Sequence, residues 1–164
     1  MNLLVTGASG FIAQSFIKYS LNKNIKISAI SRKKSKLSNK NLRWIVGKFN
    51  EIDLKRVGKF DILIHFASEG TKANERNNLK KNFEVNVFNS KDLILNAIEN
   101  NCKKFMIISS SSEFGEININ TNGVKRNDFK FPNDSYGLSK LVFNNIAYSF
   151  SKKYKCKFRI MRLF

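Results

Sequence analysis

The sequence predicts an α/β fold, in which one doubly wound parallel sheet carries helices on both of its faces. Two observations support this prediction. Short apolar segments alternate along the chain with longer segments whose apolar residues recur at helical spacing, an order typical of strand–helix–strand units. The run Ile62-Leu63-Ile64 has no polar residue within it, which indicates a central strand covered on both faces. With 164 residues the chain is long enough for one domain with its own core.

Strands are expected where β-forming apolar residues cluster between polar or glycine-containing segments. These segments are residues 3–6, 25–31, 44–46, 61–68, 104–110 and 157–164. In the second of them, Ile25, Ile27 and Ala29 share one face, as the two-residue period of a strand requires.

Helices are expected at residues 10–21, 51–57, 79–101 and 135–154. The longest carries apolar residues at mostly helical spacing, among them Val85, Leu93 and Ala97. The segment 116–133 is polar and longer than a passive connection usually is. It either covers a substrate or is only an excursion of the chain.

The chain is strongly basic, with 30 Lys and Arg against 12 Asp and Glu and a formal net charge of +18. Such a charge is typical of proteins that bind nucleic acid or a membrane surface. Lysine is spread along the whole chain, however, without an arginine-rich block or an aromatic platform. We therefore expect a bias of composition, with no specific nucleic-acid partner and no membrane partner. The charge should still attract phosphorylated small molecules.

Cys102 and Cys156 lie far apart and have no CxxC partner and no nearby histidine, so no metal site is expected. No apolar run reaches the length of a membrane span, and the first residues lead directly into a strand, so no signal peptide is expected. These features predict a soluble, cytoplasmic protein with reduced thiols. His65, the single histidine, is expected to pack at a strand end and to take no part in catalysis.

The segment LLVTGASGFIA at residues 3–13 places an apolar strand, a glycine turn and a helix in succession. This order is typical of the phosphate-binding turn of a Rossmann-type sheet. Gly7 permits the sharp turn, Gly10 lets backbone N–H groups approach a pyrophosphate, and Ala13 lets the helix lie close to the strand. The positive end of the helix would face the anion. An ordinary tight turn of an α/β protein is the alternative.

The second strand ends in Ser31-Arg32, and this end bears on the choice of cofactor. An acidic residue at this point usually holds the ribose of NAD, whereas the first acidic residue of this chain is Glu51. An arginine suits the 2′-phosphate of NADP. The sequence therefore favours NADP, with NAD as the alternative, because a basic residue can occur here by chance in so basic a chain.

Tyr136 and Lys140 lie four residues apart at the start of an expected helix and so share one face. An ammonium close to a phenol stabilises the phenolate, which would let Tyr136 act as a general acid or base. A hydroxyl from the end of the fifth strand could hold a substrate oxygen in line with it. The pair is a weak motif by itself and gains weight from its place downstream of a serine cluster.

Together these motifs resemble the extended short-chain dehydrogenase/reductase family, the NAD(P)-dependent epimerases, dehydratases and reductases of sugar nucleotides. The matching segments are TGASGFIA at 6–13, IHFAS at 64–68, NVFNSKDLILNA at 86–97, SSSSEFG at 109–115, PNDSYGLSK at 132–140 and RLF at 162–164. The resemblance implies hydride exchange between the nicotinamide of NADP or NAD and a nucleotide-linked sugar.

The resemblance also implies roles for single residues. Three would be catalytic: Ser110 would hold the substrate oxygen, Tyr136 would move the proton, and Lys140 would hold the nicotinamide ribose and tune Tyr136. The residues implied to bind the cofactor are Gly7, Ser9, Gly10, Phe11, Ile12, Arg32, Ala67, Asn86 and Lys140. Asn86 matches a family asparagine that lies near the nicotinamide.

The chain departs from the family pattern at several positions. Dehydratases of the family carry an Asp-Glu pair where this chain has Ser111 and Ser112, so a 4,6-dehydratase is less expected than an epimerase or a 4-keto-sugar reductase, unless Glu113 takes the acid's role. Lys48 stands where the family has an aspartate that faces the adenine, so cofactor affinity is expected to suffer.

The family pattern continues beyond RLF into a substrate-binding lobe. We therefore expect residues 1–164 to form a dinucleotide-binding domain without that lobe. A dinucleotide-binding module without turnover, or a truncated remnant, is the alternative to an enzyme. The resemblance further implies a homodimer that pairs through the helices at 79–101 and 135–154.

Overall fold

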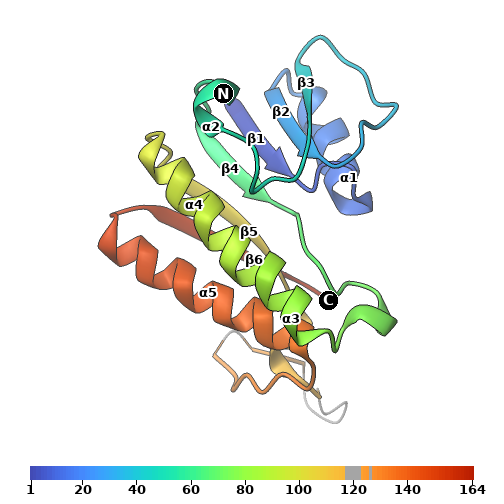
Figure 1. Cartoon of the computed structure of the whole chain (residues 1–164), viewed down its shortest axis with the longest axis vertical. Helices are drawn as coiled ribbons and strands as arrows, with labels where there is room; N and C mark the ends of the chain where they lie inside the picture. The colour runs from blue at the N-terminus through green and yellow to red at the C-terminus, as the bar shows by residue number, and fades with distance from the viewer. Residues whose placement is uncertain (117–122, 126) are drawn as a thin grey trace.

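A computed structural model of the chain describes residues 1–116, 123–125 and 127–164 (Figure 1). Its strands are β1 (Asn2–Thr6), β2 (Lys26–Ser31), β3 (Leu42–Val46), β4 (Ile62–His65), β5 (Lys104–Ser110) and β6 (Lys157–Leu163). Its α-helices are α1 (Phe11–Leu21), α2 (Leu54–Val57), α3 (Leu79–Phe83), α4 (Ser90–Glu99) and α5 (Ser135–Lys153). The shorter turns are η1 (Ala73–Glu75), the π-helical η2 (Glu84–Asn89) and η3 (Ser111–Phe114).

The described strands form one parallel sheet in the order β3-β2-β1-β4-β5-β6. The order reverses between β1 and β4, where Thr6 stands opposite His65. Because each half winds outward from this point, the loops after β1 and β4 part there and open a crevice at the carboxyl edge of the sheet. The doubly wound α/β fold predicted from the sequence is confirmed.

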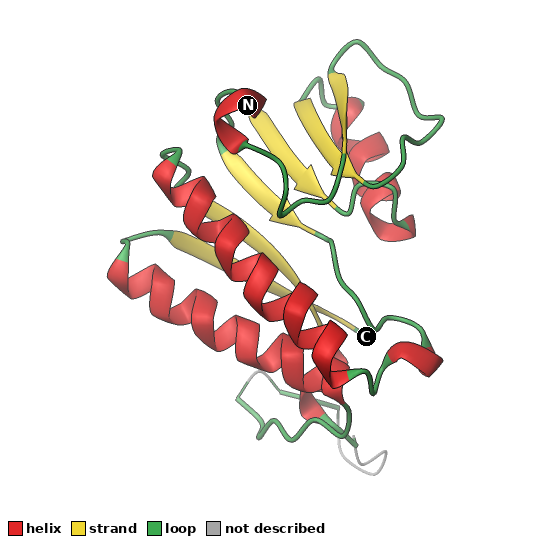
Figure 2. Cartoon of the chain, viewed as in Figure 1, coloured by secondary structure: helices red, strands yellow, loops and turns green. Residues whose placement is uncertain are grey.

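Helices cover both faces of the sheet, as the alternation of side chains along the strands requires (Figure 2). On one face, α1 packs with Ile17 and Leu21 onto Val5 and Ile27. On the other, α4 and α5 lie side by side and belong to a core cluster that includes Leu63. The apolar residues of β4 are therefore covered on both faces of the sheet. This confirms the prediction that Ile62-Leu63-Ile64 belongs to a central strand.

The helix expected at residues 79–101 is in fact α3, η2 and α4 in succession, so the prediction of one regular helix was wrong in its centre. In a π turn the backbone hydrogen bonds join residues five apart, one more than in an α-helix. The hydroxyl of Ser90 donates to the carbonyl of Val85, five residues earlier, at 2.8 Å. This turn places Asn86 in the interior, with 2% of its surface exposed.

The strand expected at 61–68 is shorter than predicted and ends at His65, because the following residues turn away at the crevice. Of the long polar segment at 116–133, residues 117–122 and 126 lie outside the described residues. Within the described ranges no helix is long and apolar enough to cross a membrane. The same ranges hold no group of three or more His, Cys, Asp and Glu side chains that could bind a metal ion.

Candidate functional site

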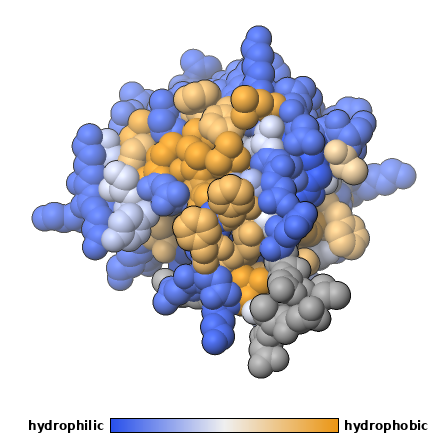
Figure 3. Space-filling view, turned by 90° about the horizontal axis from the view of Figure 1, so that it is seen from below, coloured by the Kyte–Doolittle hydropathy of each residue, from blue (hydrophilic) through white to orange (hydrophobic). Residues whose placement is uncertain are grey.

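A cavity of about 770 Å³ opens at the carboxyl ends of β1, β4 and β5. Figure 3 looks onto this end of the molecule, where apolar side chains gather at the centre and hydrophilic ones surround them. Ten of the eleven predicted site residues line the cavity: Gly7, Ser9, Gly10, Phe11, Ile12, Arg32, Ala67, Ser110, Tyr136 and Lys140. Segments far apart in the sequence thus meet where a doubly wound sheet binds its ligands.

The glycine turn brings two backbone segments closer than side chains would allow. Gly7 has a φ of +66°, and a Cβ added there would lie 2.5 Å from the backbone nitrogen of Ala67. Only glycine therefore permits the loop after β1 to lie against the loop after β4. This approach forms the floor of the cavity.

The N-terminus of α1 offers unsatisfied backbone donors to the cavity. Gly10 is the N-cap and, as a glycine, supplies no side-chain cap, and the first turn holds no acidic residue. The first intrahelical bond runs from the N–H of Gln14 to the carbonyl of Gly10, at 2.9 Å. The N–H groups of Phe11 and Ile12 precede it and so have no acceptor within the helix. An anion such as a pyrophosphate fits this end of the helix.

The end of β2 presents a cation to the cavity. Arg32 is exposed there and forms no ion pair with any described residue. Lys48, on the same wall, pairs with Glu51 at 2.8 Å, and this hydrogen bond raises the pKa of Lys48 above its ordinary value. Arg32 is therefore available to a phosphate group at this end of the cavity.

The start of α5 places Tyr136 and Lys140 on the opposite wall. Their exposed fractions are 9% and 3%. Burial lowers the pKa of Lys140 from 10.5 to about 8, against an opposing effect of the Glu113 charge. The ammonium makes neither a hydrogen bond nor an ion pair within the described part of the chain. A buried cation that faces a cavity without a partner fits the hydroxyl groups of a bound ribose.

The end of β5 contributes a hydroxyl to the same wall. Ser110 caps η3: it accepts the N–H of Ser112 at 3.2 Å and donates to the hydroxyl of Ser112 at 3.0 Å. Ser110 and Tyr136 both line the cavity. A phenol and a second hydroxyl thus line one cavity, an arrangement that can move a proton at an alcohol or ketone oxygen.

The fold and these motifs agree with the comparison to family models. The model described as "NAD dependent epimerase/dehydratase family" matches residues 3–164. The chain belongs to this family.

Curated relatives are between a quarter and a third identical to this family member over the aligned residues. The bifunctional UDP-glucose 4-epimerase and UDP-xylose 4-epimerase 3 of Arabidopsis thaliana is 27% identical over 164 residues, covering 89% of this chain and 46% of the relative. The UDP-glucose 4-epimerase of Pisum sativum is 29% identical over 170 residues, covering 92% and 47%. The chain therefore spans about half the length of the curated relatives that it matches.

Solved structures show the same fold. The UDP-glucuronic acid 4-epimerase of Bacillus cereus, in complex with UDP-glucuronic acid and NAD, superposes with a TM-score of 0.85 at 22% identity, covering 99% of this chain and 56% of that one. The UDP-glucose 4-epimerase of Thermotoga maritima, with UDP-glucose, gives a TM-score of 0.87 at 20% identity, with coverage of 99% and 55%.

Asn86 is the one predicted site residue that does not line the cavity of this family member. Its amide accepts the N–H of Glu69 at 2.8 Å, donates to the carbonyl of Glu69 at 2.9 Å and donates to the hydroxyl of Ser139 at 2.9 Å. The side chain therefore holds the loop after β4 against α5. Its neighbours Val85 and Asn89 line the cavity instead.

Glu113 is fully buried and does not line the cavity. One carboxylate oxygen pairs with Nε of Arg162 at 2.9 Å, and the other accepts hydrogen bonds from Ser109 and Asn144. With its carboxylate so engaged, Glu113 is not placed to act as the acid of a dehydratase. Its partner, Arg162, belongs to the RLF segment at 162–164. The resemblance of that segment to the family did not indicate an ion pair between Arg162 and Glu113.

His65 lies in the interior, where the sequence placed it. Its Nδ1 is 2.6 Å from Oγ1 of Thr6, and its Nε2 is 2.8 Å from Oγ of Ser90. Because the Ser90 hydroxyl donates to Val85, it must accept from Nε2–H, and Nδ1 then accepts from Thr6. Burial, with the charge of Lys140, lowers the pKa of His65 from 6.5 to about 3, so the ring is neutral and cross-links β1, β4 and α4.

The sequence also missed Arg76, which contacts Tyr136 from the loop after β4. Nothing in its local pattern distinguishes it from the other basic residues.

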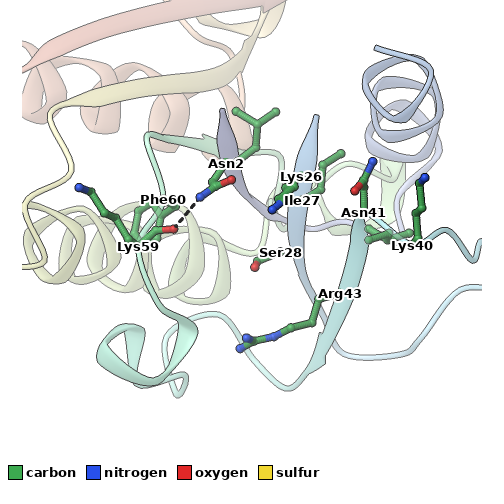
Figure 4. A pocket seen from close by; sticks show the side chains of 11 residues that line it. Asn2, Lys26, Ile27, Ser28, Lys40, Asn41, Arg43, Lys59 and Phe60 are labelled. Atoms are coloured by element: carbon green, nitrogen blue, oxygen red, sulfur yellow. Dashed lines mark hydrogen bonds between the residues drawn. The ribbon is translucent and has the colours of Figure 1, made fainter. Parts of the chain in front are cut away.

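A second, smaller pocket of about 340 Å³ lies at the amino ends of β1, β2 and β3, where basic side chains such as Lys26 and Arg43 surround it (Figure 4). It contains none of the predicted site residues.

Proposed function

We propose that the chain carries the nicotinamide dinucleotide site and the proton-transfer residues of an enzyme that acts on a nucleotide-linked sugar. The observation that carries this proposal is the meeting of three motifs in one cavity. The glycine turn, the hydroxyl of Ser110 and the pair Tyr136 and Lys140 all line it. Family membership and the sugar-nucleotide epimerases among the relatives support the substrate class.

Each residue then has a distinct task. The N–H groups of Phe11 and Ile12 bind the pyrophosphate, and the ammonium of Lys140 holds the hydroxyls of the nicotinamide ribose. The phenol of Tyr136 takes a proton from, or returns it to, the reacting sugar oxygen, while the hydroxyl of Ser110 orients that oxygen. When bound, the nicotinamide supplies the site for the hydride.

We favour NADP as the cofactor, with NAD as the alternative. The support for NADP is the guanidinium of Arg32, which forms no ion pair with a described residue, together with the absence of a carboxylate at the end of β2 in the sequence. The support for NAD is its presence in the titles of related solved structures, such as that of the Bacillus cereus epimerase.

Among the reactions of the family, we favour epimerisation or reduction of a 4-keto sugar over 4,6-dehydration. Ser111 and Ser112 carry no carboxylate, and the nearest acidic residue, Glu113, is engaged by Arg162. A dinucleotide-binding module without turnover is the second candidate.

A homodimer through the helices at 79–101 and 135–154 is part of the proposal. Its support is the exposure of large apolar side chains along this region, with exposed fractions of 55% for Phe88, 39% for Leu138 and 64% for Tyr148. The proposed compartment is the cytoplasm, on the ground that Cys102 and Cys156 are both unbonded thiols.

The test is a titration of the purified chain with NADPH and NADH, followed by nicotinamide fluorescence. We expect NADPH to bind about tenfold more tightly, and Arg32→Gln to abolish that preference, since a charge-assisted phosphate bond contributes roughly 1.5–3 kcal/mol. Tyr136→Phe should keep the cofactor affinity and lose turnover by about 10²-fold or more. Failure to bind either nucleotide refutes the cofactor site. Unchanged turnover in Tyr136→Phe refutes the role of the phenol.

A further inference from the structure

The wall of the cavity that carries Ser110 and Tyr136 is named the catalytic wall. At this wall, the guanidinium group of Arg76 contacts three side chains. Its Nε lies 2.6 Å from Oδ2 of Asp134, and its Nη2 lies 2.5 Å from Oγ of Ser112. Its Cζ stands 5.1 Å from the centre of the Tyr136 ring. These partners are 58, 36 and 60 residues away in the sequence, so the contacts exist only in the folded chain.

The backbone of Arg76 is held in the same place. Its carbonyl accepts the N–H of Tyr136 at 2.9 Å and the amide of Asn82 at 2.8 Å. Asn82 is fully buried and also bonds the carbonyl of Glu75 at 3.3 Å. A side chain anchored at both its backbone and its head has little freedom to lose when it orients a neighbour.

Two of the partners set the position of catalytic candidates. Asp134 is the N-cap of α5, where its Oδ1 accepts the N–H of Gly137 at 2.7 Å. It thereby defines the first turn of the helix that carries Tyr136. Ser112 exchanges two hydrogen bonds with Ser110, one through its hydroxyl and one through its N–H.

We propose that Arg76 is the positioning residue of the catalytic wall, which holds Tyr136 and Ser110 in register for proton transfer. The proposal rests on the function proposed above for those two residues. Arg76 does not line the cavity, so it acts through its neighbours and not on the ligand. A guanidinium suits the task because its planar fork can bond two acceptors while its face lies near a ring, which an ammonium cannot do at once.

The experiment compares Arg76→Met and Arg76→Lys with wild type and with a matched control, Arg56→Met. Arg56 also pairs with an aspartate, Asp53 at 3.4 Å, but its side chain is 89% exposed and it does not line the cavity. Four quantities are measured for each protein: the dissociation constant of NADPH and NADH, kcat and KM with a nucleotide sugar, the melting temperature, and the NMR signals of ¹³C-labelled tyrosine. The chain has four tyrosines, and the Tyr136 signal is assigned by its loss in Tyr136→Phe.

We expect Arg76→Met to keep its cofactor affinity within about twofold and its KM nearly unchanged, while kcat falls by about tenfold to a hundredfold, as misplaced catalytic groups do. The Tyr136 ring signal should shift and broaden. Arg76→Lys should recover part of kcat, because its ammonium can still pair with Asp134 but cannot also reach Ser112. Arg56→Met should match wild type in all four quantities.

Two results would overturn the proposal. An unchanged Tyr136 signal in Arg76→Met would show that the ring does not depend on the arginine. A parallel loss of cofactor affinity, melting temperature and turnover, without recovery in Arg76→Lys, would show a merely structural role. If wild type itself shows no turnover, the proposed function fails for this chain, and the Tyr136 signal alone then decides the role of Arg76.

Discussion

Replacement of Lys140 by Met should stabilise the protein at neutral pH and abolish its affinity for the cofactor. Burial lowers the pKa of Lys140 from 10.5 to about 8. Each unit of pKa corresponds to about 1.4 kcal/mol, so the cost of keeping this ammonium buried is about 3 kcal/mol. The methionine has a similar length and fills the same space without a charge.

The sign of the pH dependence follows from the protons bound in each state. Between pH 8 and pH 10.5 the unfolded chain keeps the Lys140 proton while the folded chain releases it, so the free energy of unfolding rises with pH in this window. Below pH 8 the lysine is charged in both states, and the full cost of burial is present. The free energy of unfolding of wild type should therefore rise by about 3 kcal/mol relative to that of Lys140→Met as the pH increases from 8 to 10.5.

The assay is urea unfolding of both proteins at several values of pH from 6.5 to 10.5, read by circular dichroism. Subtraction of the two curves removes the titration of all other groups that the proteins share. Lys152→Met, in the last turn of the same helix α5, is the control and should follow wild type. A difference between wild type and Lys140→Met that stays constant with pH would refute the buried, low-pKa lysine.

Two further predictions concern the glycine turn and the buried ion pair. Gly7→Ala should lose about 2 kcal/mol or more of the free energy of unfolding, together with dinucleotide binding. The control, Gly58→Ala, also has a positive φ, but no described atom lies within 4 Å of an added Cβ there, so it should lose about 1 kcal/mol. Equal losses in the two variants would exclude the close contact of Gly7 with Ala67 as the cause. Arg162→Met should cost about 3 kcal/mol in urea unfolding because it leaves Glu113 buried without its counter-charge, and Arg162→Met combined with Glu113→Gln should recover most of it. A loss below 1 kcal/mol in the single variant would contradict that account.

The strands and the glycine turn could be predicted because their determinants are local. Residues 104–110, expected as the fifth strand, form β5 with those bounds. The turn that includes Gly7 and Gly10 owes its shape to residues that follow one another directly. Family resemblance then indicated which of the many serines and lysines to place in the site, and Ser110 and Lys140 do line the cavity.

The supporting contacts could not be predicted, because their partners are distant in the sequence. Asn86 bonds the backbone of Glu69, 17 residues away, and this contact turns its amide away from the cavity. The π turn that carries Asn86 has no periodicity of its own within an otherwise helical pattern. Arg76 is one of 30 basic residues, and only the folded chain distinguishes it by its contact with Tyr136.

The charge of Glu113 acts on both Lys140 and Arg162, and this common influence links the stability of the site to its chemistry. The charge of Glu113 opposes the effect of burial on Lys140, while its Oε2 is engaged at 2.9 Å by Arg162. With Arg162 removed, the charge of Glu113 acts on Lys140 without the opposing charge of Arg162, and the pKa of Lys140 should rise above about 8. In the Arg162→Met background, the pH-dependent gain measured against Lys140→Met should therefore begin at a higher pH and be smaller. An unchanged window would show that burial alone controls the Lys140 ammonium.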